Sequence, residues 1–321
     1  LLLIFFFIQS NSSKQLDCFR VKEEDMDELR MQFMGTGAGE GIPTPFCRCR
    51  ICEHARKTGG KDVRLRSSFR VSDEMMIDFG TDIFAECIRN HTDLFDLKYL
   101  LITHTHDDHF SPFNLFLKSL VSRTNGEKVH IYLNGDAYKL IEKYDALGFD
   151  DSEHFFTDTM KNDFEFHQLH FWKQERIGDY LVTPVKGEHK GHLEANSANY
   201  LIELPDGKKF LYALDTGFYG EETRSFLKDA ALDYLIIEST FGSADRGNKP
   251  YSHLDLNSVF YLCDVLYQQG TLTDRTQVYL THINQEQDFI HEEMVAECEK
   301  RKTPYKVTVA YDGLQMADYK K

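Results

Sequence analysis

The stretch THTHDDH, residues 103–109, places three histidines and two aspartates directly after the apolar run LKYLLI. The apolar run is typical of a buried strand, along which alternate side chains point the same way, so His104 and His106 converge. Asp108 and His109 follow on the turn and can face a neighbouring point. Any two of these residues would fit a solvated polar loop, but the full H-x-H-x-D-H pattern after a buried strand indicates ligands for Zn²⁺, Mn²⁺ or Fe.

Further metal donors follow other apolar segments. His189 comes after YLVTPVKGE, Asp215 after KKFLYAL and His282 after QVYLT. Loops at one rim of a rigid sheet often carry active sites, so we expect these side chains to meet the histidine cluster. His192, three residues after His189, competes for the same position, although the strand register favours His189. The remaining histidines, His130 and His167 among them, match no pattern and are interpreted as surface or packing residues.

Composition narrows the class of protein. The 321 residues suit one large globular domain or two small ones, and the formal net charge of −15 disfavours a protein that coats nucleic acid. No apolar run reaches the roughly 18 residues of a transmembrane helix, so no membrane association is predicted. The seven cysteines form an odd set that does not resemble a disulfide framework. We therefore expect a reducing, cytoplasmic location.

The N-terminal residues 1–28 are treated as an extension outside the fold. Their first eight residues, LLLIFFFI, resemble the apolar core of a secretory signal but lack a basic region before it. A truncated, cleavable signal is one interpretation. The other interpretation is that the true translation start lies further along, so that the functional chain begins near Met26 or Met31.

The rest of the chain alternates strand and helix patterns with no linker between them, which favours a layered α/β domain. The Gly-rich GTGAGEG (35–41) predicts a tight turn near the site rather than a nucleotide cradle. Asp136 is the expected N-cap of the first long helix, and Gly148 its stop. Strands or hairpins are predicted over 29–35, 69–80, 97–105, 128–135, 179–187, 198–215, 232–240 and 276–284, and helices over 136–148, 254–270 and 288–301.

Taken together, H-x-H-x-D-H, the later lone histidine, the aspartate after YAL and the LTH motif resemble the metallo-β-lactamase superfamily. Three further stretches, GTGAGEGIP followed by CRCRIC, VTPVKGEH and SHLDLNS, resemble the phosphoribosyl 1,2-cyclic phosphate phosphodiesterase subfamily. The resemblance covers nearly the whole chain from about residue 29. It implies a single domain over 29–321 with the four-layer αβ/βα sandwich and a site for two divalent metal ions, Zn or Mn.

The resemblance also implies a role for each residue of the pattern. Asp78 would orient the histidine loop rather than bind metal. His253, in SHLDLNS, would act on the leaving group or the phosphate, although a polar residue before a helix that opens at Leu254 is the plainer interpretation. The implied ligands are His104, His106 and His189 for one metal, Asp108, His109 and His282 for the second, and Asp215 bridging both.

The function implied is a metal-dependent hydrolase, foremost a phosphodiesterase that opens a small phosphodiester, cyclic in one alternative, through a metal-bridging hydroxide. Other activities of the same fold are the alternatives: a lactonase, an RNA-processing nuclease or a cofactor-biosynthesis protein. A non-enzymatic metal-binding scaffold is disfavoured by the full ligand set. A homodimer is left open, since members of the family often dimerise.

The triplet Cys47, Cys49 and Cys52 has the tight spacing of zinc ligands. In the subfamily it resembles, a histidine three residues after the LTH histidine completes a structural zinc site, but here that position is Gln285. His54 is one candidate for the fourth ligand. Three free thiols in a loop are the alternative.

Overall fold

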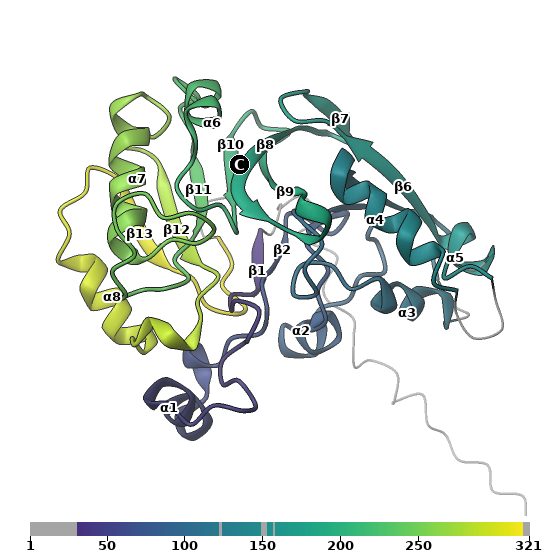
Figure 1. The fold of residues 1–321 in the computed structure, drawn as a ribbon, viewed down its shortest axis with the longest axis horizontal. Helices are drawn as coiled ribbons and strands as arrows, with labels where there is room; N and C mark the ends of the chain where they lie inside the picture. The colour runs from purple at the N-terminus through teal and green to yellow at the C-terminus, as the bar shows by residue number, and fades with distance from the viewer. Residues whose placement is uncertain (1–30, 122–123, 149–152, 157, 317–321) are drawn as a thin grey trace, which may run out of the picture.

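The computed structural model describes residues 31–121, 124–148, 153–156 and 158–316, so the expected extension at 1–28 lies outside the described residues. Within them the strands form two sheets (Figure 1). The first contains, in spatial order, β1 (Gln32–Gly35), β2 (Ser68–Arg70), β3 (Met75–Ile77), β4 (Tyr99–Leu101), β5 (Val129–Asn134) and β6 (Phe164–Leu169). The second contains β13 (Lys306–Val309), β12 (Gln277–Thr281), β11 (Tyr234–Glu238), β10 (Lys209–Ala213), β9 (Asn196–Glu203), β8 (Tyr180–Lys190) and β7 (Glu175–Ile177).

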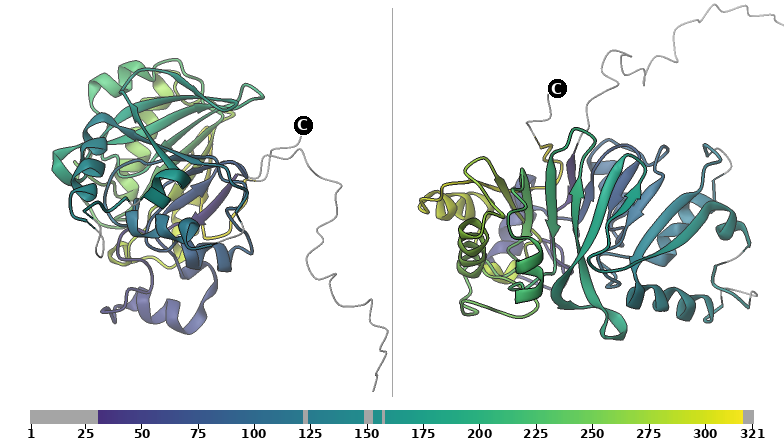
Figure 2. Two further views of the ribbon diagram at one scale, coloured as in Figure 1. Left: turned by 90° about the vertical axis from the view of Figure 1, so that its right-hand side faces the viewer. Right: turned by 90° about the horizontal axis from the view of Figure 1, so that it is seen from above.

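Helices cover the outer face of each sheet, as the view from above also shows (Figure 2). Strands β3 to β6 are mutually parallel, and so are β10 to β13, so their connections cross over outside the sheets. The first sheet is covered by α2 (Ile83–Arg89), α3 (Phe116–Ser119), α4 (Gly135–Asp145) and α5 (Asp158–Asp163), and the second by α6 (Glu221–Phe226), α7 (Leu256–Gln268) and α8 (His291–Glu299). Helix α1 (Arg50–Thr58) and the short helices η1 (Gly60–Asp62), η2 (Pro112–Leu115), η3 (His192–Glu194) and η4 (Gln285–Gln287) lie in connections.

Three apolar layers hold these elements together. The middle layer lies between the sheets, where the ring of Phe69 on β2 sits 5.8 Å from that of Tyr212 on β10. The outer layers join each sheet to its helices. Three cores between four layers confirm the predicted αβ/βα sandwich.

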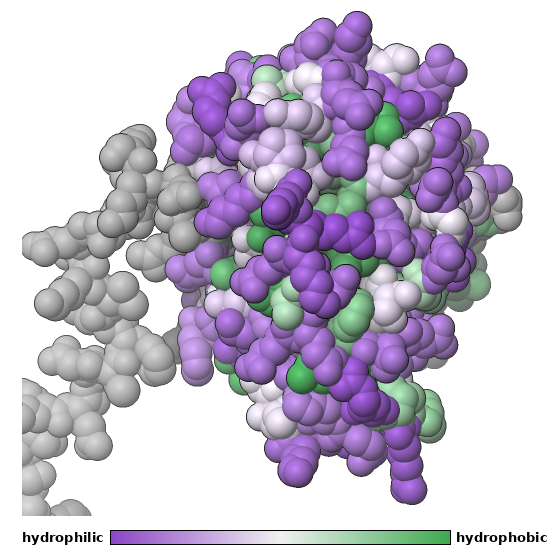
Figure 3. Space-filling view, turned by 90° about the vertical axis from the view of Figure 1, so that its left-hand side faces the viewer, coloured by the Kyte–Doolittle hydropathy of each residue, from purple (hydrophilic) through white to green (hydrophobic). Residues whose placement is uncertain are grey.

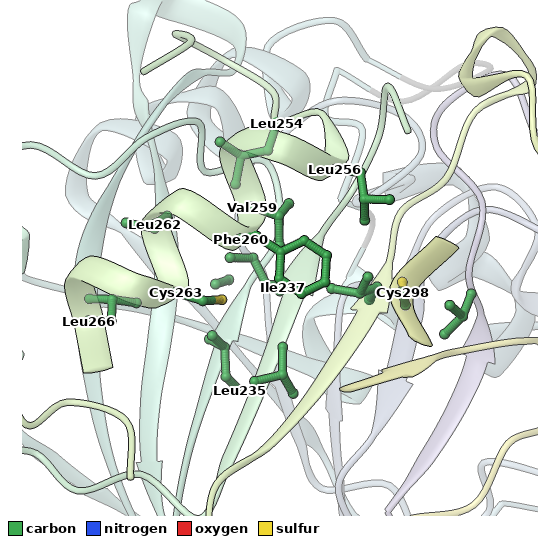
Figure 4. Packing of buried hydrophobic residues seen from close by; sticks show 14 of the residues in the cluster. Leu235, Ile237, Leu254, Leu256, Val259, Phe260, Leu262, Cys263, Leu266 and Cys298 are labelled. Atoms are coloured by element: carbon green, nitrogen blue, oxygen red, sulfur yellow. The ribbon is translucent and has the colours of Figure 1, made fainter. Parts of the chain in front are cut away.

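Helix α7 illustrates the outer packing (Figure 4). Leu235 and Ile237 of β11 meet the apolar face of the helix, and both are fully buried. Full burial of one such side chain is worth about 1.5–3 kcal/mol. Figure 3 shows the outer surface of the molecule on the side where α7 and α8 lie. This surface is mostly hydrophilic, as expected where amphipathic helices face water.

The three predicted helix starts are wrong by one to three residues, and the helix expected over 288–301 begins at His291. The helix expected to open at Leu254 begins at Leu256, because Asp255 accepts hydrogen bonds from the backbone N–H groups of Asn257 and Ser258. The helix expected to be capped by Asp136 begins at Gly135 instead. There Asn134, an equally good capping residue, accepts a 3.0 Å hydrogen bond from the N–H of Ala137.

The predicted strand at 97–105 is shortened to β4, Tyr99–Leu101. The residues after it leave the sheet and form the histidine loop, so the loop starts from a rigid, fully buried strand end.

None of the helices in the described part of the chain is long and apolar enough to cross a bilayer.

Candidate metal centre

The predicted ligands come together at the ends of strands from both sheets. His104 follows β4, Asp215 follows β10 and His282 follows β12, whereas His189 lies near the end of β8. All four side chains are buried. The structure therefore gathers the strand-end donors at one place, and it shows that two different sheets contribute to it, which sequence alone did not indicate.

The first group gathers three imidazoles around one carboxylate. The Nε2 of His104 lies 3.0 Å from the Nδ1 of His106, and the Nε2 of His189 lies 3.2 Å from that same Nδ1. Asp215 Oδ2 lies 3.1 Å from His104 Nε2 and 3.6 Å from His189 Nε2. This is a three-histidine, one-carboxylate set with its donor atoms directed at one point.

The second group shares the same aspartate. The Nε2 atoms of His109 and His282 lie 3.2 Å apart, and Asp108 Oδ2 lies 3.2 Å from His109 Nε2. Asp215 Oδ1 lies 3.0 Å from His282 Nε2, and its Oδ2, which faces His104, also lies 3.4 Å from His109 Nε2, so this carboxylate stands between the two groups. One carboxylate placed in this way can bridge two cations.

Outer partners fix the orientation of the imidazoles. Asp78 Oδ2 lies 2.7 Å from His109 Nδ1, Ser252 Oγ lies 2.7 Å from His189 Nδ1, and Thr240 Oγ1 lies 2.9 Å from His282 Nδ1. In each case the outer contact is made by Nδ1, which leaves Nε2 free for the centre. Such outer hydrogen bonds set the tautomer and ring direction of metal-binding histidines.

Asp78 has the orienting position expected from the sequence. Besides its contact with His109, its Oδ1 accepts hydrogen bonds from the backbone N–H and the hydroxyl of Thr103, both at 2.8 Å. Thr103 is the first residue of the histidine loop. Asp78 thereby ties the loop to the end of β3 and is absent from the groups of converging donor atoms.

The histidines of the two groups differ in their protonation. Burial lowers the pKa of His104 and His106, and it lowers the pKa of His189 to about 4, so these imidazoles are neutral donors at pH 7. Burial acts in the same direction on His109 and His282, but the surrounding carboxylates outweigh it. They raise the pKa of His109 well above its ordinary value and that of His282 to about 10.

The pKa values of the carboxylates are lowered by the same charged histidines. Burial favours the neutral acid, yet the positive charge on His282 and His109 outweighs it and holds the pKa of Asp215 well below its ordinary range. His109 does the same for the pKa of Asp108. Without another cation, the centre must therefore keep protons on its own histidines to balance its buried carboxylates.

The donor set fits divalent metal ions. Neutral imidazoles and ionised carboxylates are the ligands of Zn²⁺ and related ions. Asp215 Oδ1 is buried and accepts no hydrogen bond from any described residue, which leaves a lone pair directed into the centre. A cation would satisfy that oxygen and would replace the protons on the two basic imidazoles.

The backbone at the site is strained. Asp78, Asp215 and His282 have φ angles of 66°, 47° and 56°, in the left-handed region that residues other than glycine rarely adopt. Each such residue costs about 1–3 kcal/mol and persists only where the surrounding structure enforces it. At each of these positions the strained residue directs its side chain into the centre or its supporting network.

The Gly-rich turn lies at the site, as predicted. A Cβ atom on Gly39 would lie 3.2 Å from Asp108 Oδ2, so the turn runs directly past this carboxylate. A Cβ on Gly80, in the loop after β3, would lie 2.0 Å from the carbonyl oxygen of Asp108 and cannot be accommodated. Backbone approaches of this kind hold Asp108 against the histidine loop.

Glu238, the last residue of β11, was not identified from the sequence. This fully buried carboxylate accepts hydrogen bonds from the N–H groups of Thr216 and Gly217, and its Oε2 lies 3.1 Å from His253 Nδ1. Its place at a strand end, like that of Asp215, was the available signal. Burial lowers the pKa of His253, but Glu238 and Asp215 outweigh it and raise that pKa.

His253 lies beside the second group. Its Nδ1 is 3.6 Å from Asp215 Oδ1, and its ring stacks on that of His282 with 5.7 Å between centroids. About a fifth of the side chain is exposed, in contrast to the fully buried ligand candidates around it. His192, the competitor for the His189 position, instead directs its Nδ1 to the carbonyl oxygen of Thr105 at 2.6 Å.

The cysteine triplet also comes together. The sulfur atoms of Cys47, Cys49 and Cys52 lie within 4.8 Å of one another at the start of α1. His54, one candidate for the fourth ligand, is absent from this group of converging atoms, and its Nε2 lies 3.2 Å from Asp62 Oδ2. The Oε1 atom of Gln285 is buried and receives no hydrogen bond from the described residues.

The comparison with sequence families decides the superfamily. The model of the β-lactamase superfamily domain matches residues 74–283, which include both groups of donors. The chain belongs to the metallo-β-lactamase superfamily. Membership indicates a metal-dependent hydrolase, in agreement with the donor set described above. No curated protein sequence matches the chain significantly.

Solved structures of the superfamily share the fold at low sequence identity. A diphosphatase from the PhnP family is 21% identical with a TM-score of 0.65, and the match covers 89% of this chain and 96% of that one. Zn²⁺-bound PqqB from Methylobacterium extorquens is 19% identical with a TM-score of 0.66, over 89% and 99%. The short form of human tRNase Z is 17% identical with a TM-score of 0.58, over 90% and 98%.

Two adjacent aspartates allow a matched test of the centre. Asp108 faces His109, whereas Asp107 is exposed. We predict that Asp108→Ala lowers metal affinity by at least roughly 10–100-fold, because a donor to the cluster is lost, while Asp107→Ala keeps the wild-type metal content. Elemental analysis after dialysis measures this difference. Equal metal content in the two variants would contradict the assignment.

Metal uptake should also release protons. His109 and His282 have raised pKa values and are protonated at pH 7 in the metal-free protein, so Zn²⁺ binding should displace about two protons per chain. The release should decrease as the pH approaches about 10, where His282 loses its proton unaided. A pH indicator in weak buffer records it. Stoichiometric zinc uptake without proton release would refute this distribution of charge.

Proposed function

We propose that the chain is a dinuclear metal-dependent phosphodiesterase acting on a small phosphodiester, with cyclic diesters among the candidate substrates. His104, His106, His189 and Asp215 would hold one metal ion, and Asp108, His109, His282 and Asp215 the other. Two divalent ions at this position would supply a water molecule of lowered pKa and would neutralise charge on the phosphoryl oxygens. The remaining chemistry falls to the side chains around them.

The observation that carries this proposal is the pair formed by His253 and Glu238. The carboxylate of Glu238 holds the Nδ1 of His253 at 3.1 Å and raises the pKa of the imidazole together with Asp215. This raised pKa favours the charged ring, whose Nε2–H would be available to protonate a departing oxygen. General acid catalysis by a positioned histidine contributes roughly 10²–10⁴-fold to rate.

Nearby cations suit an anionic substrate. Phe241 contacts the ring of His253 edge-on at 5.9 Å, and the guanidinium of Arg246 lies over the Phe241 ring at 4.2 Å. A phosphodiester would meet the charged imidazole beside the metal ions with this arginine close by. Among the structural neighbours, the names diphosphatase and tRNase are in keeping with phosphoryl chemistry.

We also propose that Cys47, Cys49 and Cys52 hold a structural zinc ion. Their sulfur atoms converge where α1 begins, and Arg50 on this helix contacts Asp288 in the loop before α8 and Glu293 in the first turn of α8. A zinc ion here would fix the loop that carries Cys47 and Cys49 to the first turn of α1. Structural zinc sites of this size contribute directly to folding free energy.

The substrate class is tested first with paired substrates. The metal-loaded protein should hydrolyse bis(p-nitrophenyl) phosphate and should leave a panel of lactones unchanged. Turnover of lactones without turnover of any phosphodiester would move the function to the lactonase alternative and would contradict the proposal.

The role of His253 gives a sharper prediction. His253→Ala should keep both metal ions and lower turnover of a ribose cyclic phosphodiester by roughly 10²–10⁴-fold, because the sugar alkoxide needs a proton to depart. With p-nitrophenolate as the leaving group the loss should be much smaller. Steady-state kinetics on both substrates, with the exposed His170→Ala as the control, measures the difference. Equal losses on the two substrates would exclude the acid role.

The pH profile adds a second readout of the same pair. Because the pKa of His253 is raised in the folded protein, activity on the poor leaving group should persist above pH 6.5 and fall as His253 deprotonates. Replacing Glu238 by glutamine should move that fall to lower pH, since the charge that favours the imidazolium is removed. An unchanged profile in Glu238→Gln would contradict the pairing.

A further inference from the structure

Besides the cysteine triplet, one further group of side chains that could hold a metal ion lies on strands β5 and β6. The sequence predicts His130 and His167 to be surface or packing residues, and the structure shows them partly exposed and stacked on tyrosine rings. In the structure they meet Glu165, and the three side chains place one ligand atom each within 4.8 Å of the others. His130 is separated by many residues from Glu165 and His167, so only the parallel pairing of the two strands brings the three together.

The strand register puts all three side chains on one face. His130 pairs with Glu165, and Tyr132 pairs with His167, in the parallel ladder between β5 and β6. The alternate residues of the same strands, Val129, Ile131 and Phe164, point the other way into the apolar layer under the helices. The ladder therefore fixes the spacing of the cluster through backbone hydrogen bonds.

The distances suit a tetrahedral ion. His130 Nδ1 lies 2.9 Å from His167 Nε2 and 3.9 Å from Glu165 Oε2, and the His167 nitrogen lies 3.8 Å from Glu165 Oε1. Ligand atoms at about 2.0–2.2 Å from a tetrahedral Zn²⁺ lie roughly 3.4 Å from one another. The observed separations bracket that value, so small side-chain rotations bring all three atoms to bonding distance.

Neighbouring aromatic rings hold the imidazoles in place. Tyr132 stacks on His167 with 4.7 Å between centroids and an interplanar angle of 20°, and Tyr99 stacks on His130 at 6.2 Å and 28°. Burial lowers the pKa of His167, with Glu165 opposing the effect, so this ring is a neutral donor at pH 7. Roughly a third of each imidazole and half of the carboxylate are exposed, which leaves room for water ligands.

We propose that His130, Glu165 and His167 form an additional binding site for a divalent transition-metal ion of the Zn²⁺ type, separate from the candidate active centre. Two imidazoles and one carboxylate leave one tetrahedral position for water. The bound ion would cross-link β6, the last strand of the first sheet, to β5. The alternative is a metal-independent hydrogen bond between the two imidazoles.

Site-resolved chemical labelling tests this proposal without relying on activity. The protein with its active centre loaded is treated with diethyl pyrocarbonate in the presence of Zn²⁺, of Mg²⁺ or of neither, and modified peptides are quantified by mass spectrometry. Zn²⁺ should reduce labelling of His130 and His167 several-fold and should leave the exposed His170 unchanged. Mg²⁺, which prefers oxygen ligands, should protect none of them.

Equilibrium dialysis of variants supplies the second arm. The double variant His130→Gln with His167→Gln should bind about one Zn²⁺ fewer per chain than the wild type, whereas His170→Gln should bind the wild-type number. Both replaced side chains are partly exposed, so the fold should tolerate the change. Equal labelling of His130 and His167 with and without Zn²⁺, or equal zinc binding by the double variant, would overturn the proposal.

Discussion

The structure depends on the charge balance around Asp215. Its carboxylate is buried between His104 on one side and His282 on the other, at 3.1 and 3.0 Å, and no described residue donates a hydrogen bond to Oδ1. An ionised carboxylate is expensive to bury unless positive charge lies beside it, so positive charge must be supplied at this point. Protons on His109 and His282 supply it in the metal-free protein, and divalent ions are better suited to do so.

The sandwich makes this concentration of polar groups tolerable. Each donor stands at or just beyond the end of a strand whose other residues are packed in one of the three apolar layers. The rigid strand ends can therefore impose left-handed backbone angles on Asp78, Asp215 and His282. The roughly 1–3 kcal/mol of strain at each position is offset by the packing of the layers on either side. The same rigidity fixes the outer partners that orient the imidazoles.

Most of the layered fold and of the candidate ligand set could be predicted from the sequence, since polar donors after apolar strands are a local pattern. Three features could not. Glu238 needs its contact with His253 to be recognised, because a lone carboxylate ending a strand has many interpretations. The cluster of His130 and His167 depends on the register between β5 and β6, which sequence alone does not fix. Finally, Asn134 displaced the expected cap of α4 because neighbouring polar residues compete for that role.

The most direct test of a dinuclear centre is a crystal structure of the protein grown with Zn²⁺, with anomalous diffraction data collected on both sides of the zinc absorption edge. A centre bridged by Asp215 should give two anomalous peaks about 3.5–4 Å apart with the carboxylate of that residue between them. One peak should lie among His104, His106 and His189, and the other beside His109 and His282. A single peak, or none at this cluster in crystals that contain zinc elsewhere, would contradict a dinuclear centre.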